Sequence, residues 1–186
     1  LHLEKHDLTE LPDNFSQLSS LVQFYISNNW LTSLPEVFGS LTNLSTLDLG
    51  YNQLESVPES IGSLINLEYL FLFNNQLHFL PESICDLDLD WDGISPANYP
   101  YFASGGNYLC ECDLIPDCVE NSANVNLSME PLYYSFLLYA PQDCTDATQD
   151  CIIDNLCPEL GDINGDGGWN VLDVVTLANC VLAGNC

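Results

Sequence analysis

The sequence predicts a solenoid that is followed by a cysteine-rich segment and by a calcium-binding loop with a helix. Three observations lead to this prediction. Leucines, prolines and asparagines recur with a period of 23 residues in the first part of the chain. Nine cysteines lie mostly in the later part. A run of Asp, Asn and Gly close to the C-terminal end has the spacing of a calcium loop.

The period is visible in three consecutive units that share the template LxxLPxxhxxLxxLxxLxLxxNx. These units are LTELPDNFSQLSSLVQFYISNNW, LTSLPEVFGSLTNLSTLDLGYNQ and LESVPESIGSLINLEYLFLFNNQ. A single unit cannot bury its own leucines, but stacked units form a continuous core. We expect the recurring asparagine, found at Asn29, Asn52 and Asn75, to bond backbone groups at the turn and to form a ladder along the stack.

The template resembles the leucine-rich repeat family over roughly residues 1–110. The resemblance implies an α/β solenoid in which each LxLxxN segment is a short parallel strand on the concave face. His6 stands where the asparagine belongs in the first unit, and Asn107 follows Asn75 by 32 residues instead of 23. An insertion near residues 86–100 accounts for the excess. We expect its acidic run to be a solvated loop, with a second cation site as the alternative; the run is Asp86, Asp88, Asp90 and Asp92.

The concave face is the predicted interaction surface. Strand alternation directs Leu and Ile inward and the intervening side chains to the concave face. Exposed aromatic patches usually mark interaction sites, so we predict that a protein or a glycan binds Tyr25, Asp48, Tyr51, Tyr69, Phe71 and Phe73. The same rows contain His2, Glu4, Lys5, Gln23, Ser27, Asn28 and Thr46. The alternative is that the chain's own insertion or C-terminal segment covers the patch.

A cysteine-rich segment, residues 110–160, follows the solenoid, residues 1–109. Cys110, Cys112 and Cys118, with Cys85 as a further candidate, resemble the disulfide-locked C-terminal caps of extracellular leucine-rich repeat proteins. A zinc site in CECDLIPDC is disfavoured because paired CxxC knuckles are lacking. The odd number of cysteines suggests one unpaired thiol or a link to another chain. The full set of disulfide candidates is Cys85, Cys110, Cys112, Cys118, Cys144, Cys151, Cys157, Cys180 and Cys186.

The segment LYYSFLLY, residues 132–139, has two interpretations. It can cover the end of the solenoid, or it can form an exposed apolar strand that pairs edge to edge with a neighbouring molecule.

The last segment, residues 161–186, opens with the stretch GDINGDGGWNVLD. Its spacing predicts a twelve-residue calcium loop with Gly167 at the sharp bend. The stretch resembles a dockerin type I repeat, because Asp occupies the twelfth position and the apolar run VLDVVTLANCVL follows as a helix. In that family two copies dock onto a cohesin partner, whereas one copy stands here. A metal-free acidic turn is the alternative. The predicted Ca²⁺ ligands are Asp162, Asn164, Asp166, Gly168, Asn170 and Asp173.

The net charge and the cysteine content indicate which partners and which compartment suit the protein. One basic residue against 27 acidic ones gives a net charge of -26, which disfavours nucleic acid and anionic membranes. The cysteine content indicates an oxidising compartment, so we expect an extracellular or cell-surface protein. The chain begins inside a repeat, and we expect it to be a mature fragment. The longest apolar stretch, PLYYSFLLYA, is too short to span a bilayer, so no membrane span is expected.

The sequence favours a binding function over catalysis. The candidate imidazole bases are His2, His6 and His78, and none has a Ser or Cys partner at a suggestive spacing. We predict a secreted, non-catalytic protein-interaction or adhesion module that is stabilised by calcium and disulfides. The alternative is a structural subunit that self-assembles into an extracellular filament or surface layer.

Overall fold

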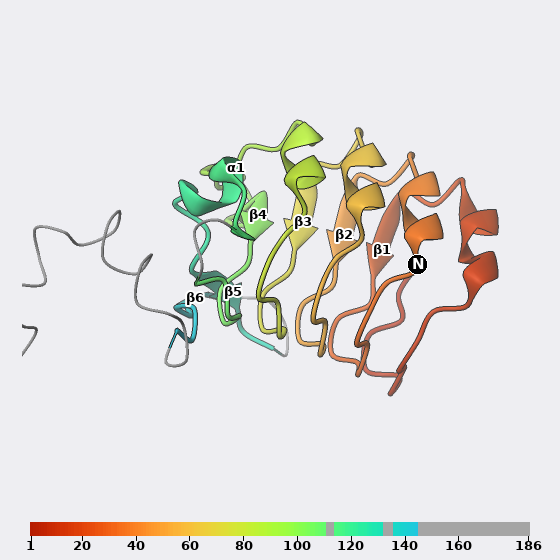
Figure 1. Cartoon of the computed structure of the whole chain (residues 1–186), viewed down its shortest axis with the longest axis horizontal. Helices are drawn as coiled ribbons and strands as arrows, with labels where there is room; N and C mark the ends of the chain where they lie inside the picture. Colours follow the sequence, from red (N-terminus) through yellow and green to blue (C-terminus); the bar gives the residue numbers. More distant parts are fainter. Residues whose placement is uncertain (111–113, 132–135, 145–186) are drawn as a thin grey trace, which may run out of the picture. The chain divides into compact units, whose positions relative to one another are not determined.

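The computed structural model describes residues 1–110, 114–131 and 136–144 of the 186-residue chain. These residues confirm the α/β solenoid. Four short strands form one parallel sheet in the order β1-β2-β3-β4, and an isolated parallel bridge between His2 and Tyr25 extends the pairing to the first repeat (Figure 1). The strands are β1 Gln23–Tyr25, β2 Thr46–Asp48, β3 Tyr69–Phe71 and β4 Phe102–Ala103.

The register of the sheet follows the 23-residue period. Gln23 pairs with Thr46, and Thr46 pairs with Tyr69, so residues one period apart lie side by side. The same register joins Phe71 to Ala103, which lie 32 residues apart. The predicted insertion therefore leaves the sheet between β3 and β4 and returns to it without shifting the pairing.

A row of 3-10 helices lies on the side of the solenoid opposite the strands (Figure 1). Each helix follows a proline at its N-cap, and the φ of these prolines lies between -73° and -70°. Proline presets this φ and lacks an N–H, so it suits the start of a helix. The four helices are η1 Asp13–Leu18, η2 Glu36–Ser40, η3 Glu59–Ser63 and η4 Glu82–Asp86.

The core lies between the strands and the helices, and an asparagine ladder closes it at the turns. The leucines of the template, such as Leu31, Leu54 and Leu77, are fully buried. The Asn52 Oδ1 accepts the N–H of Leu31 at 3.1 Å, and its amide nitrogen donates to the carbonyls of Ile26 and Leu49. The other ladder residues, Asn29, Asn75 and Asn107, bond the backbone in the same way. The predicted ladder is confirmed.

The insertion alternates between buried and exposed side chains. Leu87 and Leu89 are buried, and the Trp91 ring packs edge-on against Phe102 with centroids 4.9 Å apart. The intervening carboxylates are exposed, as expected of a solvated acidic loop. Within the described ranges no group of three or more His, Cys, Asp or Glu side chains could hold a metal ion, so the second cation site is not present there. The exposed carboxylates are those of Asp86, Asp88, Asp90 and Asp92.

Two disulfides join the end of the solenoid to the cysteine-rich segment. Cys85, at the end of η4, pairs with Cys118 in the helix α1, Asp117–Glu120, and Cys110 pairs with Cys144. Because Cys110 and Cys118 are both oxidised, neither is a zinc ligand. The other five candidates lie outside the described residues; they are Cys112, Cys151, Cys157, Cys180 and Cys186.

An antiparallel hairpin follows α1 and packs on the sheet. Its strands are β5 Leu127–Met129 and β6 Leu137–Tyr139. The N–H groups of Gly105 and Gly106 donate to the carbonyls of Leu127 and Ala140, both at 2.8 Å, so the hairpin is bonded to the last turn of the solenoid. None of the helices in the described part of the chain is long and apolar enough to cross a membrane.

Candidate partner-binding groove

The concave face is open at its N-terminal half. A hollow of about 500 Å³ lies over the first turn and strands β1 to β3. Tyr99, from the insertion, and Pro131, just after β5, also line it. Its walls are mixed aromatic and polar, formed by His2, Glu4, Lys5, Gln23, Tyr25, Ser27, Asn28, Thr46, Asp48, Tyr69, Phe71, Tyr99 and Pro131.

The predicted exposed patch is wrong for its central residues. Phe71 is 4% exposed, Phe73 is fully buried and Asp48 is 1% exposed. Phe71 and Phe73 form a small second core with Ala103 and with Met129 of the hairpin. The chain's own C-terminal segment thus covers this half of the face, which was the alternative left open by the sequence.

Tyr51 departs from the prediction for a different reason. Its backbone has a φ of 54°, so the chain turns at residue 51 and its side chain does not follow the strand alternation. The Tyr51 hydroxyl donates to the Met129 carbonyl at 2.6 Å, and its ring packs edge-on against Phe73 at 5.6 Å. Tyr51 therefore helps to fix the hairpin and does not line the hollow.

Four of the six predicted residues do meet in the hollow. Tyr25 and Tyr69 are half-buried, and Asp48 and Phe71 lie deeper. Tyr99 and Pro131 were not anticipated, because their positions depend on segments outside the repeats. Tyr99 is placed by a tight turn, in which the N–H of Ser95 donates to the Tyr99 carbonyl at 2.7 Å. The only sequence signal for it was the extra length of the fourth repeat.

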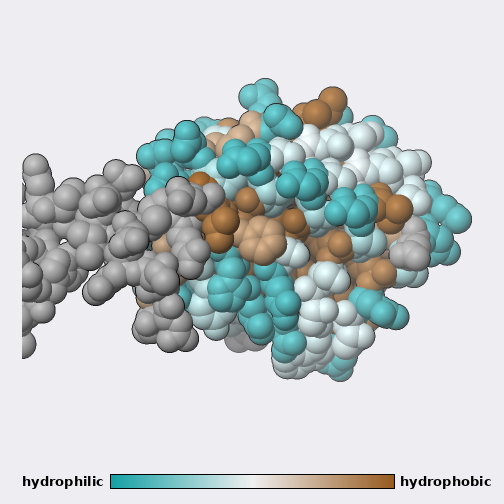
Figure 2. Space-filling model, viewed as in Figure 1, coloured by the Kyte–Doolittle hydropathy of each residue, from teal (hydrophilic) through white to brown (hydrophobic). Residues whose placement is uncertain are grey.

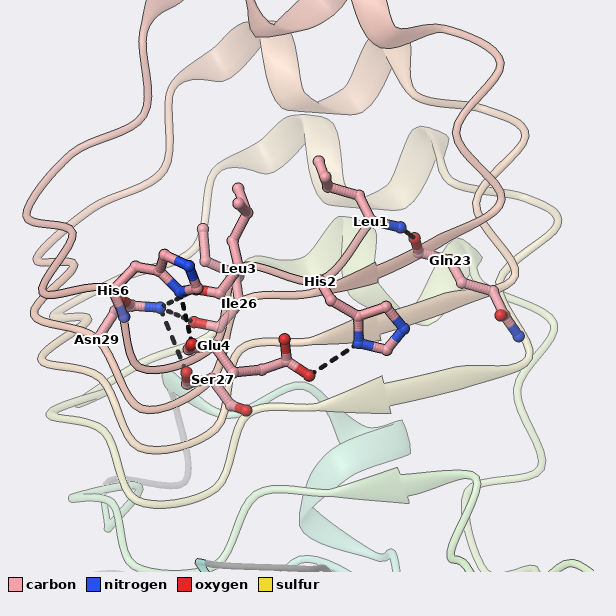
Figure 3. A network of polar contacts seen from close by, with 9 residues as sticks. All are labelled: Leu1, His2, Leu3, Glu4, His6, Gln23, Ile26, Ser27 and Asn29. Atoms are coloured by element: carbon pink, nitrogen blue, oxygen red, sulfur yellow. Dashed lines mark hydrogen bonds and ion pairs between the residues drawn. The ribbon is translucent and has the colours of Figure 1, made fainter.

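The first repeat supplies most of the charged groups at the hollow (Figure 3). His2 Nδ1 lies 2.9 Å from Glu4 Oε1, and the His2 ring stacks on Tyr25 with centroids 4.5 Å apart. Figure 3 also places His6 beside the Asn29 amide, where the His6 N–H donates to Asn29 Oδ1 at 3.0 Å. His6 thus occupies the first position of the ladder row, as the sequence indicated.

The hydroxyl of Tyr25 remains protonated over the physiological range. Burial is the main factor that raises the pKa of Tyr25, and the neighbouring carboxylates of Asp48 and Glu4 raise it further. A hydrogen bond with Thr46 opposes this rise. The hollow therefore presents a neutral phenol beside carboxylates, and such groups can bind a partner by stacking and hydrogen bonds.

The predicted calcium ligands, residues 162–173, lie outside the described residues. Their donor set consists of carboxylate, amide and carbonyl oxygens, which are the ligands that calcium prefers. The residues present in the chain therefore fit the ion in kind and in spacing.

Hydrophobic surface is not confined to the hollow. The face seen in Figure 2 carries hydrophobic residues bordered by hydrophilic ones. The most exposed large apolar side chains in the described part of the chain are Ile65, Phe136 and Tyr139.

A family model matches the repeated part of the chain. Residues 19–62 and 42–88 match the family model described as Leucine Rich repeats (2 copies). The repeated part of the chain is a leucine-rich repeat solenoid. A leucine-rich repeat protein of Leptospira interrogans shares 26% sequence identity over 64% of this chain, with a TM-score of 0.43. The chain spans about a third of that protein's length, since the match covers 33% of it. No curated protein matches the chain.

Proposed function

We propose that the chain is a secreted, non-catalytic recognition module whose concave groove binds a segment of a partner protein. The observation that carries this proposal is the hollow itself. It combines half-buried aromatic rings, such as Tyr25 and Tyr69, with polar groups, such as Gln23 and Thr46, on a scaffold of paired strands. Rigid aromatic anchors among polar groups are typical of protein interfaces. Leucine-rich repeats generally mediate protein–protein interaction, in agreement with this role.

Selection of peptides from a displayed random library tests the proposal. We expect selected peptides to bind the intact protein and to lose at least tenfold in affinity when Tyr25 or Tyr69 is replaced by alanine. Tyr108→Ala is the matched control, because Tyr108 is an exposed aromatic residue that does not line the hollow. Peptides that bind all variants equally well would contradict the groove as the binding site.

The chemistry of the cysteines supports a location outside the cell. Two bridges, Cys85–Cys118 and Cys110–Cys144, close loops of similar length in the cap. Disulfides persist in oxidising compartments and are rare in the cytosol. Mass spectrometry of the native protein should recover both bridged peptide pairs, whereas free thiols at these four positions in the native material would contradict secretion.

Calcium is the proposed stabiliser of the C-terminal segment. The loop from Asp162 to Asp173 supplies oxygen ligands at suitable positions. We expect one calcium ion to bind with a dissociation constant of about 0.1 to 1 mM, and Asp166→Asn to weaken binding. Asp86→Asn is the matched control, since Asp86 is an exposed carboxylate of the insertion. Isothermal titration calorimetry that finds the two variants equal to the parent protein would contradict the site.

Self-assembly is the second candidate function, and β6 favours it. Phe136 and Tyr139 are 69% and 74% exposed, so the hairpin presents large rings to solvent. Exposed strands with apolar side chains can pair with a neighbouring chain. Sedimentation at increasing protein concentration should then show oligomers that disappear in Tyr139→Lys. A monomer at all concentrations would leave recognition as the function.

A further inference from the structure

The residues that line the hollow indicate which kind of partner side chain it binds. This inference rests on the proposed function. We propose that the hollow receives the positively charged side chain of a lysine or arginine in the partner protein. Three features favour such a side chain: the aromatic walls of the hollow, the carboxylates among them and the net charge of the whole chain.

The aromatic walls come from three separate parts of the chain. Tyr25 lies on β1, Tyr69 and Phe71 lie on β3, and Tyr99 belongs to the insertion. Tyr69 also contacts the ring of Tyr101, the residue before β4, with centroids 5.0 Å apart, so its ring is supported from the neighbouring strand. Aromatic rings around a hollow attract a cation through their negative faces, and the attraction increases when the cation loses water.

Two carboxylates lie among these rings. Asp48, on β2, is almost completely buried, and its Oδ1 accepts the N–H of Gly50 at 3.0 Å, which fixes its orientation. Glu4 lies on the neighbouring first turn. Both residues line the same hollow as Tyr25. A guanidinium or ammonium group in the hollow would thus meet phenol oxygens and carboxylate charge at the same place.

The basic groups at the hollow do not remove this preference. Lys5 is exposed at the rim, so its ammonium is mostly hydrated. His2 is also exposed, and its ring contacts the Glu4 carboxylate. Asp48 lies deeper in the hollow, two positions along the sheet from His2. The net charge of -26 attracts a basic partner over a longer range and repels an acidic one. Charge complementarity therefore favours a basic segment over an acidic peptide.

The experiment uses displayed random peptides selected on the intact, calcium-loaded protein. We expect the selected sequences to share a lysine or an arginine at one position. Synthetic copies with citrulline in place of arginine, or norleucine in place of lysine, should bind about tenfold more weakly. Citrulline keeps the shape of arginine and removes its charge, so this comparison isolates the cation.

Protein variants locate the effect in the hollow. Tyr99→Leu and Asp48→Asn should each weaken the basic peptide about tenfold and should reduce the difference between arginine and citrulline. Tyr108→Leu, outside the hollow, should change neither quantity. If Asp48→Asn does not fold, Glu4→Gln and the citrulline peptide on the unaltered protein still decide the question.

Two results would overturn the inference, and they are distinguishable. Peptides that depend on Tyr25 and Tyr69 but lack a basic residue, or bind equally well with citrulline, would retain the groove and exclude the cation. An oligosaccharide that displaces the peptides equally well from the unaltered protein and from Asp48→Asn would likewise retain the groove as the binding site and exclude the cation. If no peptide depends on the hollow at all, the proposed function fails together with the inference.

Discussion

The two halves of the concave face have the same repeat positions and opposite surroundings. One row of the sheet runs through His2, Tyr25, Asp48, Phe71 and Ala103. Its side chains change from exposed at His2, through half-buried at Tyr25, to buried at Phe71. The repeat fixes the direction of each side chain, but the β5–β6 hairpin decides whether that side chain is surface or core. A position in the template is therefore not enough to identify a binding residue.

Truncation of a ring in each half should give the largest contrast. Phe73→Ala removes a fully buried ring that contacts the hairpin core and should lower the free energy of unfolding by about 3 to 5 kcal/mol. Tyr25→Ala, in the open half, should lower it by about 1 kcal/mol or less. Urea-induced unfolding followed by circular dichroism measures both values. Equal losses would mean that the hairpin does not bury the covered half.

Removal of the two disulfides one at a time distinguishes the contribution of each to the hairpin and to the rest of the cap. The double variants Cys110→Ser with Cys144→Ser, and Cys85→Ser with Cys118→Ser, open loops with sequence separations of 34 and 33 residues. Each should lower the free energy of unfolding by about 2 to 4 kcal/mol. Only the first pair encloses β5 and β6, so only its loss should speed hydrogen exchange at the hairpin amides. Faster exchange there in both variants would contradict separate roles.

The asparagine ladder should contribute equally to stability under the open half and under the covered half of the concave face. Asn52→Ala leaves the N–H of Leu31 without its acceptor, and Asn107→Ala does the same to Leu77. Each change should lower the free energy of unfolding by about 1 to 3 kcal/mol. Thermal unfolding of the two variants measures the comparison. A much smaller effect at one position would show that the ladder is not continuous.

Alkaline pH should have the smallest effect on stability. It acts through the hydroxyl of one half-buried tyrosine in each half of the concave face. Burial raises the pKa of both Tyr25 and Tyr51 above the ordinary value of about 10. The unfolded chain thus releases these protons at lower pH than the folded chain. The associated stability is present below pH 10 and is lost as the pH rises through the folded pKa. Unfolding between about pH 9 and 11 should show a shallower loss in Tyr25→Phe and in Tyr51→Phe; an unchanged slope would contradict the shifts.

The sequence predicts those features that depend on the period and misses those that depend on distant segments. The strand register, the ladder and the solvated carboxylates of the insertion all follow from local spacing, and all are found. The cover over Phe73 depends on Met129, more than 50 residues later. One local clue existed, because a Cβ at residue 50 would overlap the Phe73 ring, so Gly50 leaves room for a buried neighbour. The turn at Tyr51 had a signal in the period, because Tyr51 lies one repeat from Asn28 and from Asn74, and asparagine is enriched at positive φ.

The insertion shows that one coil of this solenoid can be lengthened without disturbing the next. Tyr101 still meets Tyr69, and Asn107 still accepts the N–H of Leu77, although extra residues separate the two coils. The excursion carries its own buried side chains, begins at the end of η4 and ends beside the groove, where Tyr99 lines the hollow. It is therefore a natural site for grafting: foreign loops placed between Asp92 and Asn98 would alter the wall of the hollow and leave the stack of strands as it is.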